Sequence, residues 1–224
     1  MNKKKLTLLF TLFLLTLKLF SQDISSGKFR IGLNFGANLF DLNKDDVFDR
    51  YKGKAGYTFG LSLEYKLSEF LSLTSDVNYD KKVMEMEDDL YRDVNGNMTL
   101  TTIKDKIKFA YINITLELRY YFKNKAFINI GGFYNLSLNI KNETVIKDTG
   151  ESVTFWEYDK VIKNYDFGLS VGIGYRFSLD NKNHFLIKIK DELGLANIAD
   201  YPNSSLTDLK TNTLKLILNW ELPL

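Results

Sequence analysis

The sequence predicts an all-β fold, namely an eight-stranded antiparallel up-and-down transmembrane β-barrel preceded by a cleavable signal peptide. Three observations lead to this prediction. Apolar residues recur at every second position in eight segments of the 224-residue chain. The connections between these segments alternate between short and long, and the chain starts with a basic and then an apolar stretch. A period of two places successive side chains on opposite faces of a β-strand.

The alternation defines the strands one by one. In the first strand, FRIGLNFGANL, every odd position from Phe29 to Leu39 is apolar and every even position is polar or glycine. The fourth strand breaks phase, because Tyr111 lies on the opposite face from Ile112 and Ile114, so we expect a β-bulge there. The seventh strand has the weakest pattern. The expected strands are 28–40, 55–67, 69–82, 106–122, 125–140, 163–179, 183–194 and 211–222.

The connections fall into two classes. Three are turns of a few residues, at 66–69, 123–125 and 180–183. Four are long and polar, at 41–54, 83–105, 141–162 and 195–210. An even strand number with short turns on one side and long loops on the other is typical of bacterial outer-membrane barrels, whose short turns face the periplasm.

The direction of the apolar face distinguishes a membrane barrel from a soluble one, which would bury that face. The polar face is rich in glycine, which suits a cramped interior: Gly32, Gly36, Gly60, Gly131, Gly168, Gly172 and Gly174. Aromatic residues gather beside the short turns, as at a membrane interface: Tyr65, Phe70, Tyr120, Tyr121, Phe122, Phe127, Tyr175, Phe177, Phe185 and Trp220. The strands also exceed the ~9–11 residues needed to cross a bilayer. We therefore expect lipid on the apolar face.

The first 21 residues resemble a secretory signal peptide. Lys3, Lys4 and Lys5 precede the apolar run from Leu6 to Leu17, and Ser21 offers a cleavage site. An uncleaved anchor is the alternative, but the run is shorter than the ~20 residues of a spanning helix. We expect a signal peptide over 1–21 and one barrel domain over 22–224, in the cell outer membrane and monomeric.

The predicted lumen carries charges of both signs, and an interior this narrow predicts that they pair and plug it. A narrow conducting path gated by the same pairs is the alternative. These charged residues are Arg30, Glu64, Lys66, Asp76, Glu117, Arg119, Asp166, Arg176, Lys188, Lys190, Glu192, Lys215 and Glu221.

No residue is predicted to be catalytic, cofactor-binding or metal-ligating, and no cofactor is expected. His184 is the only histidine of the chain and lies beside a short turn, so we expect a polar rim residue there. The alternative is a general base of a lipid-modifying enzyme, which would have to lie near the outer leaflet. The net charge of +2 predicts no nucleic-acid partner. The chain has no cysteine, so no disulfide contributes to its stability.

Two long loops are candidates for contact with a protein partner. The 83–105 loop is acidic around Glu85 and Glu87, which fits either a cation site or a solvated loop with a turn at Asn95-Gly96. The 141–162 loop holds Phe155, Trp156 and Tyr158, which either anchor a partner or pack on their own strands.

Several segments resemble the PorT-like outer-membrane β-barrel family of Bacteroidota. YINITLELRYYFKNKAFINIGGFYNLSLN is similar to the central hairpin of that family, YDFGLSVGIGYRF to a later glycine-rich strand, and GYTFGLSLEYKLSEFLSLTSDVNY to the second hairpin. Thr115 stands where many members have proline. The resemblance spans residues 28–222 and implies the barrel and its location.

These features together predict a non-enzymatic outer-membrane protein with a structural or interaction role. We expect outer-membrane lipid and the barrel-assembly machinery as partners, and a protein partner at the outer loops or at the periplasmic rim. The resemblance implies a link to secretion for a partner at the periplasmic rim. A narrow porin-like channel and a lipid-modifying enzyme are the alternative functions.

Overall fold

The structure, a computed structural model, describes residues 28–42, 50–92, 98–147, 150, 152–153, 162–178, 183–200 and 209–223. The expected signal peptide over residues 1–21 lies outside the described residues.

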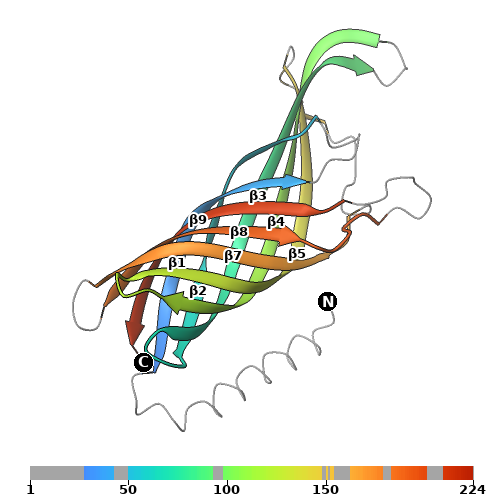
Figure 1. Cartoon of the computed structure of the whole chain (residues 1–224). Helices are drawn as coiled ribbons and strands as arrows, with labels where there is room; N and C mark the ends of the chain where they lie inside the picture. The colour runs from blue at the N-terminus through green and yellow to red at the C-terminus, as the bar shows by residue number, and fades with distance from the viewer. Residues whose placement is uncertain are drawn as a thin grey trace.

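Eight long antiparallel strands form a closed barrel, as the sequence predicts. Each strand pairs with its neighbour in the chain order, β1 pairs with β9, and the β4–β5 pairing completes the ring. The two-residue β6, Ser152–Val153, pairs only with the outer end of β5. Figure 1 shows the tilted strands and the short turns gathered at one end. The long strands are β1 Phe29–Leu42, β2 Lys52–Lys66, β3 Leu71–Arg92, β4 Met98–Tyr121, β5 Ala126–Ile146, β7 Tyr165–Ser178, β8 His184–Gly194 and β9 Thr211–Pro223.

The barrel is polar inside and apolar outside. The inward residues Asn34 and Asn219 are both 0% exposed, whereas the outward residues Ile130 and Ile173 are 60% exposed. The same alternation continues around all eight strands, so apolar side chains cover the outer surface. A soluble protein would have to hold this surface in water, but lipid solvates it without cost.

Aromatic rings line the short-turn end of the outer surface. Ring pairs come from neighbouring positions on this face, with centroids 4.7 Å apart for Phe29–Tyr65 and 4.8 Å apart for Tyr175–Phe177. The predicted girdle is wrong for two residues, because Tyr121 and Phe127 are 8% and 0% exposed and point into the barrel. Both lie at inward positions of β4 and β5, where the period of two takes precedence over residue type.

The expected bulge lies on β5 and not on β4. Tyr111, Phe109 and Ile107 keep the inward phase of β4 and are at most 1% exposed. The register of the β4–β5 pairing shifts between Ala110, which faces Asn139, and Tyr111, which faces Ser137. One extra residue is therefore inserted in β5. The apolar residues of β4 need no change of phase because they pack on one another inside the outer half of the barrel.

Strands β3, β4 and β5 are much longer than predicted. The expected loop 83–105 is largely strand, and β5 continues into the expected loop 141–162 as far as Ile146. Residues 81–92, 98–108 and 139–146 form an outer extension that projects past the other strands (Figure 1). Pairing between β3 and β4 continues to Arg92 opposite Met98. The period of two persists there, but charged residues replace apolar ones on the outward face, which makes the segments look like loops. The predicted turn at Asn95-Gly96 lies outside the described residues.

Candidate functional site

The inner end of the lumen holds a cluster of two arginines and two glutamates. Arg119 Nη1 lies 3.0 Å from Glu221 Oε1 and 3.8 Å from Glu64 Oε2. Arg176 Nη2 lies 2.9 Å from Glu221 Oε2 and also pairs with Glu64. The Tyr121 hydroxyl donates to Glu64 over 2.9 Å. These groups come from β2, β4, β7 and β9, so the cluster ties opposite walls of the barrel together.

Aromatic rings complete this inner cluster. The Arg176 guanidinium lies 4.1 Å from the centroid of the Tyr121 ring, and that of Arg119 lies 4.7 Å from the Phe127 ring. Tyr121 and Phe127 pack with Leu186, which is fully buried. Cation–π contacts are strongest where the cation is desolvated, as it is here.

A second cluster fills the middle of the barrel. Asp76 Oδ2 lies 2.8 Å from Lys188 Nζ and 3.1 Å from Lys190 Nζ, and Lys190 also pairs with Glu117 over 2.8 Å. All four side chains are 1% exposed. Ser170 and Asn129 donate to the Glu117 carboxylate over 2.6 and 2.7 Å. Two carboxylates and two ammonium groups therefore neutralise each other.

A third cluster lies toward the outer end. Lys215 Nζ sits between Asp80 and Glu192, at 2.6 and 2.8 Å. Lys82 donates to Thr213 over 2.9 Å, and its ammonium lies 5.1 Å from the Phe40 ring. Asp80 and Lys82 are absent from the lumen charges predicted from the sequence, although both share the even-numbered, inward face of β3 with Asp76.

Every lumen residue named from the sequence lies on the inner face, and these charges are buried except for Lys66 and Arg176, which are partly exposed. Asp166 is held by hydrogen bonds from Thr211 over 2.7 Å and from Asn135 over 3.2 Å. Sequence periodicity therefore predicts which side chains enter the lumen. It does not predict which of them pair, because partners come from strands far apart in the sequence.

An apolar cap lies above the third cluster at the outer mouth. It combines strand residues with residues of the described loop segments: Phe40, Leu42, Tyr51, Met84, Ile107, Phe109, Tyr111, Ile162, Ala196, Ile198 and Leu209. The loop segments are held by backbone hydrogen bonds from Lys163 to Ile198 over 2.8 Å and from Ile198 to Leu209 over 2.9 Å. The cap is the feature that the sequence analysis missed, since its members are scattered along the chain.

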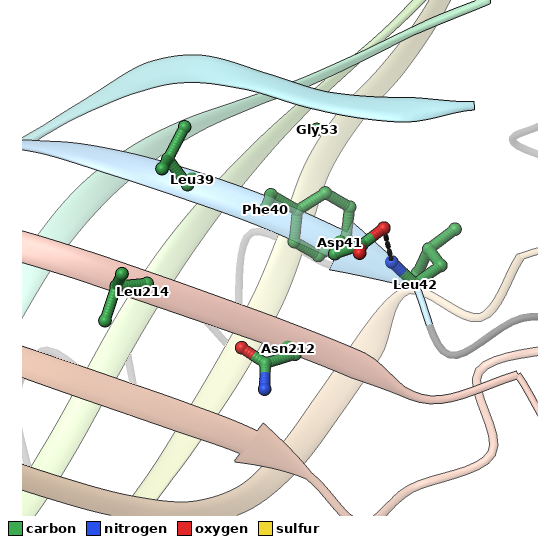
Figure 2. Close-up of a pocket in the computed structure, with 7 residues that line it drawn as sticks. All are labelled: Leu39, Phe40, Asp41, Leu42, Gly53, Asn212 and Leu214. Atoms are coloured by element: carbon green, nitrogen blue, oxygen red, sulfur yellow. Dashed lines mark hydrogen bonds between the residues drawn. The ribbon is translucent and has the colours of Figure 1, made fainter.

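A shallow pocket opens beside the cap, between the outer ends of β1, β2 and β9. Figure 2 shows Phe40 and Leu39 together with the short side chains around them; Phe40 is 1% exposed and Leu39 51% exposed, on opposite faces of β1. The Asp41 carboxylate accepts a hydrogen bond from the Leu42 amide over 3.0 Å. Asn212 is the other polar residue drawn there, so the pocket contains no acid–base pair among the residues that line it.

His184 lies at the start of β8 on the short-turn side, where the sequence places it. It faces Ser178 on β7 and Glu221 on β9 across the sheet. Its Nδ1 has no hydrogen-bond partner among the described residues. The position lies at the opposite end of the barrel from the outer loops.

Glutamates of the outer extension are bound by lysines. Glu85 lies 3.1 Å from Lys104, 3.3 Å from Lys106 and 3.4 Å from Lys54. Partial burial raises the pKa of Glu85, but the hydrogen bonds and charges of these lysines outweigh it and leave the pKa below its ordinary value. Glu87 pairs with Lys147. Within the described part of the chain, no group of three potential ligands is placed to hold a metal ion.

The aromatic residues Phe155, Trp156 and Tyr158 lie outside the described residues, so their expected role is not addressed by the structure. Among the described residues, no helix is long and apolar enough to cross a membrane.

An antiparallel barrel with an apolar outer belt and a charged, paired interior defines the class of outer-membrane β-barrel proteins. The chain belongs to the outer membrane protein beta-barrel domain family, which it matches over residues 20–200. Its place is therefore the cell outer membrane, in contact with lipid.

Solved structures with a similar fold include three outer-membrane proteins. The attachment invasion locus protein Ail of Yersinia pestis has a TM-score of 0.41 and 12% identity, over 87% of this chain and 99% of that chain. Neisserial surface protein A has a TM-score of 0.43 and 10% identity, over 89% of this chain and 98% of that chain. OprG of Pseudomonas aeruginosa has a TM-score of 0.42 and 13% identity, over 88% of this chain and 97% of that chain. No curated protein matches the chain.

Proposed function

We propose that this protein is a non-enzymatic and non-conducting barrel that presents its outer extension to a protein partner. The observation that carries this proposal is the interior, where three ionic clusters and the apolar cap lie one above another. Nothing in these clusters resembles a nucleophile with its base, because every carboxylate of the first two clusters is bound by cations.

The plugged lumen follows from the energetics of the clusters. An eight-stranded barrel has an interior just wide enough for side chains. Opening a path would separate buried pairs such as Lys190–Glu117, whose side chains are 1% exposed. Breaking a buried pair costs about 3–5 kcal/mol because a charge is left uncompensated. Several such pairs would have to open together, and the cap would have to move as well.

The outer extension supplies the surface for a partner. β3 continues from Tyr79 to Arg92, which is about 40 Å along the strand at ~3.3 Å per residue. A barrel needs no such extension to span lipid. The resemblance to PorT-like proteins supports a link to secretion for a second contact, at the periplasmic rim. Cleavage of residues 1–21, insertion of 22–224 by the barrel-assembly machinery and a monomeric state belong to the same proposal.

Conductance in a planar bilayer tests the plugged lumen. The refolded protein is expected to give no discrete current steps. Stable steps from the unchanged protein would overturn the plugged lumen and favour the channel.

Crosslinking in intact cells tests the partner. A photo-crosslinking residue at Glu143, in the β5 part of the extension, is expected to recover one specific protein, and the same residue at Lys123 in a short turn serves as the control. The product should vanish when residues 83–105 are shortened to a tight turn. Equal products from both sites, or a product that survives shortening, would contradict a partner at the extension.

The alternative function, a lipid-modifying enzyme, leads to a different expected result. If the chain acted on membrane lipid through His184, deletion of the gene and His184→Ala would change lipid composition in the same way. We expect neither change, and mass spectrometry of extracted lipid checks it.

A further inference from the structure

The outward face of β3, β4 and β5 changes from apolar to basic at one level. On β3, the outward residues up to Tyr79 form the apolar belt and the next one is Lys81. The first charged outward residue beyond the belt is Lys108 on β4 and Lys141 on β5. A strand crosses the bilayer in ~9–11 residues. Counted from Leu71, that length ends at Tyr79 to Lys81, so Lys81 lies at the outer edge of the hydrocarbon layer. Lys108 and Lys141 follow it across the sheet on β4 and β5.

These three lysines face one another without full compensation. Lys108 on β4 lies directly opposite Lys141 on β5. Lys81 on β3 pairs with Ala110, two residues from Lys108, so Lys81 and Lys108 are diagonal neighbours. Like charges directly opposite each other destabilise a sheet. The arrangement would be stabilised by an anion placed between the ammonium groups.

The protein itself supplies only part of that negative charge. Lys108 pairs with Glu143. Within the described chain, neither Lys81 nor Lys141 has a carboxylate within 4.0 Å. Farther out, Glu85 compensates Lys104 and Lys106. On the described outward face of β3–β5, the lysines without a carboxylate partner are therefore those at the edge of the belt.

The lysines also gather on one side of the barrel. On the opposite side, the charged outward residues of β1 and β8 are the acids Asp41 and Asp191. A general attraction of a cationic protein to the membrane would not produce this asymmetry. A specific binding surface on β3–β5 would.

A shallow groove lies in the apolar belt of the same three strands. Ser75, Leu116 and Gly132 occupy one row across β3, β4 and β5, and the small residues on either side of Leu116 leave the space that the groove occupies. Ser75 is six residues from Lys81, about 20 Å along the strand. The groove is therefore within the hydrocarbon layer, where a lipid held at the lysines has its acyl chains.

We propose that Lys81, Lys108 and Lys141 bind the phosphate of an outer-leaflet lipid whose acyl chains lie against β3–β5. Ammonium groups bind phosphate through charge-assisted hydrogen bonds. The site does not depend on whether the lumen conducts or whether the extension has a protein partner.

Lipid binding to the purified protein tests this site. The protein in a zwitterionic detergent is titrated with diphosphorylated lipid A, and bound lipid is measured by native mass spectrometry. The unchanged protein should bind it, and Lys81→Gln/Lys141→Gln should weaken binding by roughly tenfold or more, since each basic residue near a lipid surface contributes separately. Lys81→Arg/Lys141→Arg should retain binding. The matched control Lys28→Gln/Lys123→Gln removes the same charge at the short-turn end and should change nothing.

Two further arms distinguish the source of the phosphate. Dephosphorylated lipid A should bind at least tenfold more weakly, and equimolar inorganic phosphate should not displace the lipid. Unaltered binding in the Gln variant, equal binding of the dephosphorylated lipid, or displacement by phosphate would each overturn the proposal. If the double Gln variant does not fold, as judged by heat-modifiable gel mobility, Lys141→Gln and the two lipid forms decide the question.

Discussion

Individual residues of the lumen are chosen for space as much as for polarity. The glycines of the polar face fit a cramped interior, as predicted from the sequence. Gly174 on β7 lies opposite Phe127 on β5, whose ring points inward. A Cβ at Gly174 would overlap the Phe127 ring and lie 2.5 Å from the Ile187 carbonyl oxygen. The sequence reveals the glycine but not the ring that needs it.

Gly174→Ala is therefore expected to destabilise the barrel. Overpacking of this kind costs about 1–3 kcal/mol. Urea unfolding of the protein in lipid vesicles measures it. Gly132→Ala is the control, because a Cβ there would meet only the Gly168 oxygen at 3.4 Å. If both variants unfolded with the same free energy as the unchanged protein, the packing explanation would be contradicted.

The buried pairs should show strong coupling. Lys190→Met leaves Glu117 without its cation and leaves Asp76 with Lys188 alone, so we expect a loss of about 3–5 kcal/mol. Lys190→Met/Glu117→Gln removes both charges of one pair and should recover much of that loss. A double-mutant cycle on unfolding free energies checks this coupling. Additive effects of the two substitutions would show that the pair does not act as a unit.

At the scale of whole elements, the sequence predicts the inner ends of β3, β4 and β5 better than their outer ends. The inner ends of β4 and β5 are predicted to within a residue, at Tyr121 and Ala126. Their outer ends are missed because the outward face there carries lysine and glutamate, so hydrophobic alternation disappears while the backbone ladder continues. Pairing in the extension is supported by cross-strand charges, a signal that hydropathy does not detect.

Glu85 should stabilise the extension in a pH-dependent way. Its pKa is below the ordinary value of 4.5 in the folded protein because Lys104 and Lys106 bind it. Its contribution is therefore complete above pH 4.5 and is lost as pH falls through the folded pKa. Glu85→Gln should increase amide hydrogen exchange of residues 100–108 at pH 7. The ratio of variant to unchanged protein, measured at each pH, should approach one below the folded pKa. A ratio that stays constant with pH would contradict this role.

At the scale of the whole molecule, the sequence predicts that the polar face lies inside the barrel and the apolar face outside. It does not predict that the outer mouth is closed. Periodicity places Lys188 and Leu216 on opposite faces, and the glycines and aromatic residues indicate which face meets lipid. The apolar cap assembles from β1, β3, β4 and three loop segments. Only the tertiary fold brings residues as distant as Phe40 and Leu209 together.

A charge placed on the outer face should show directly whether that face contacts lipid. Val171 lies in the middle of the outward row of β7 and is 48% exposed, and Leu222 lies near the inner end of β9 and is 38% exposed. In a soluble barrel, either position would accept lysine because water would solvate the ammonium. In a bilayer, Val171→Lys places a charge near the midplane and should cost about 2–4 kcal/mol, while Leu222→Lys at the interface should cost about 0–1 kcal/mol. Unfolding in phosphatidylcholine vesicles measures both variants. Equal, small effects would mean that the apolar face does not contact hydrocarbon.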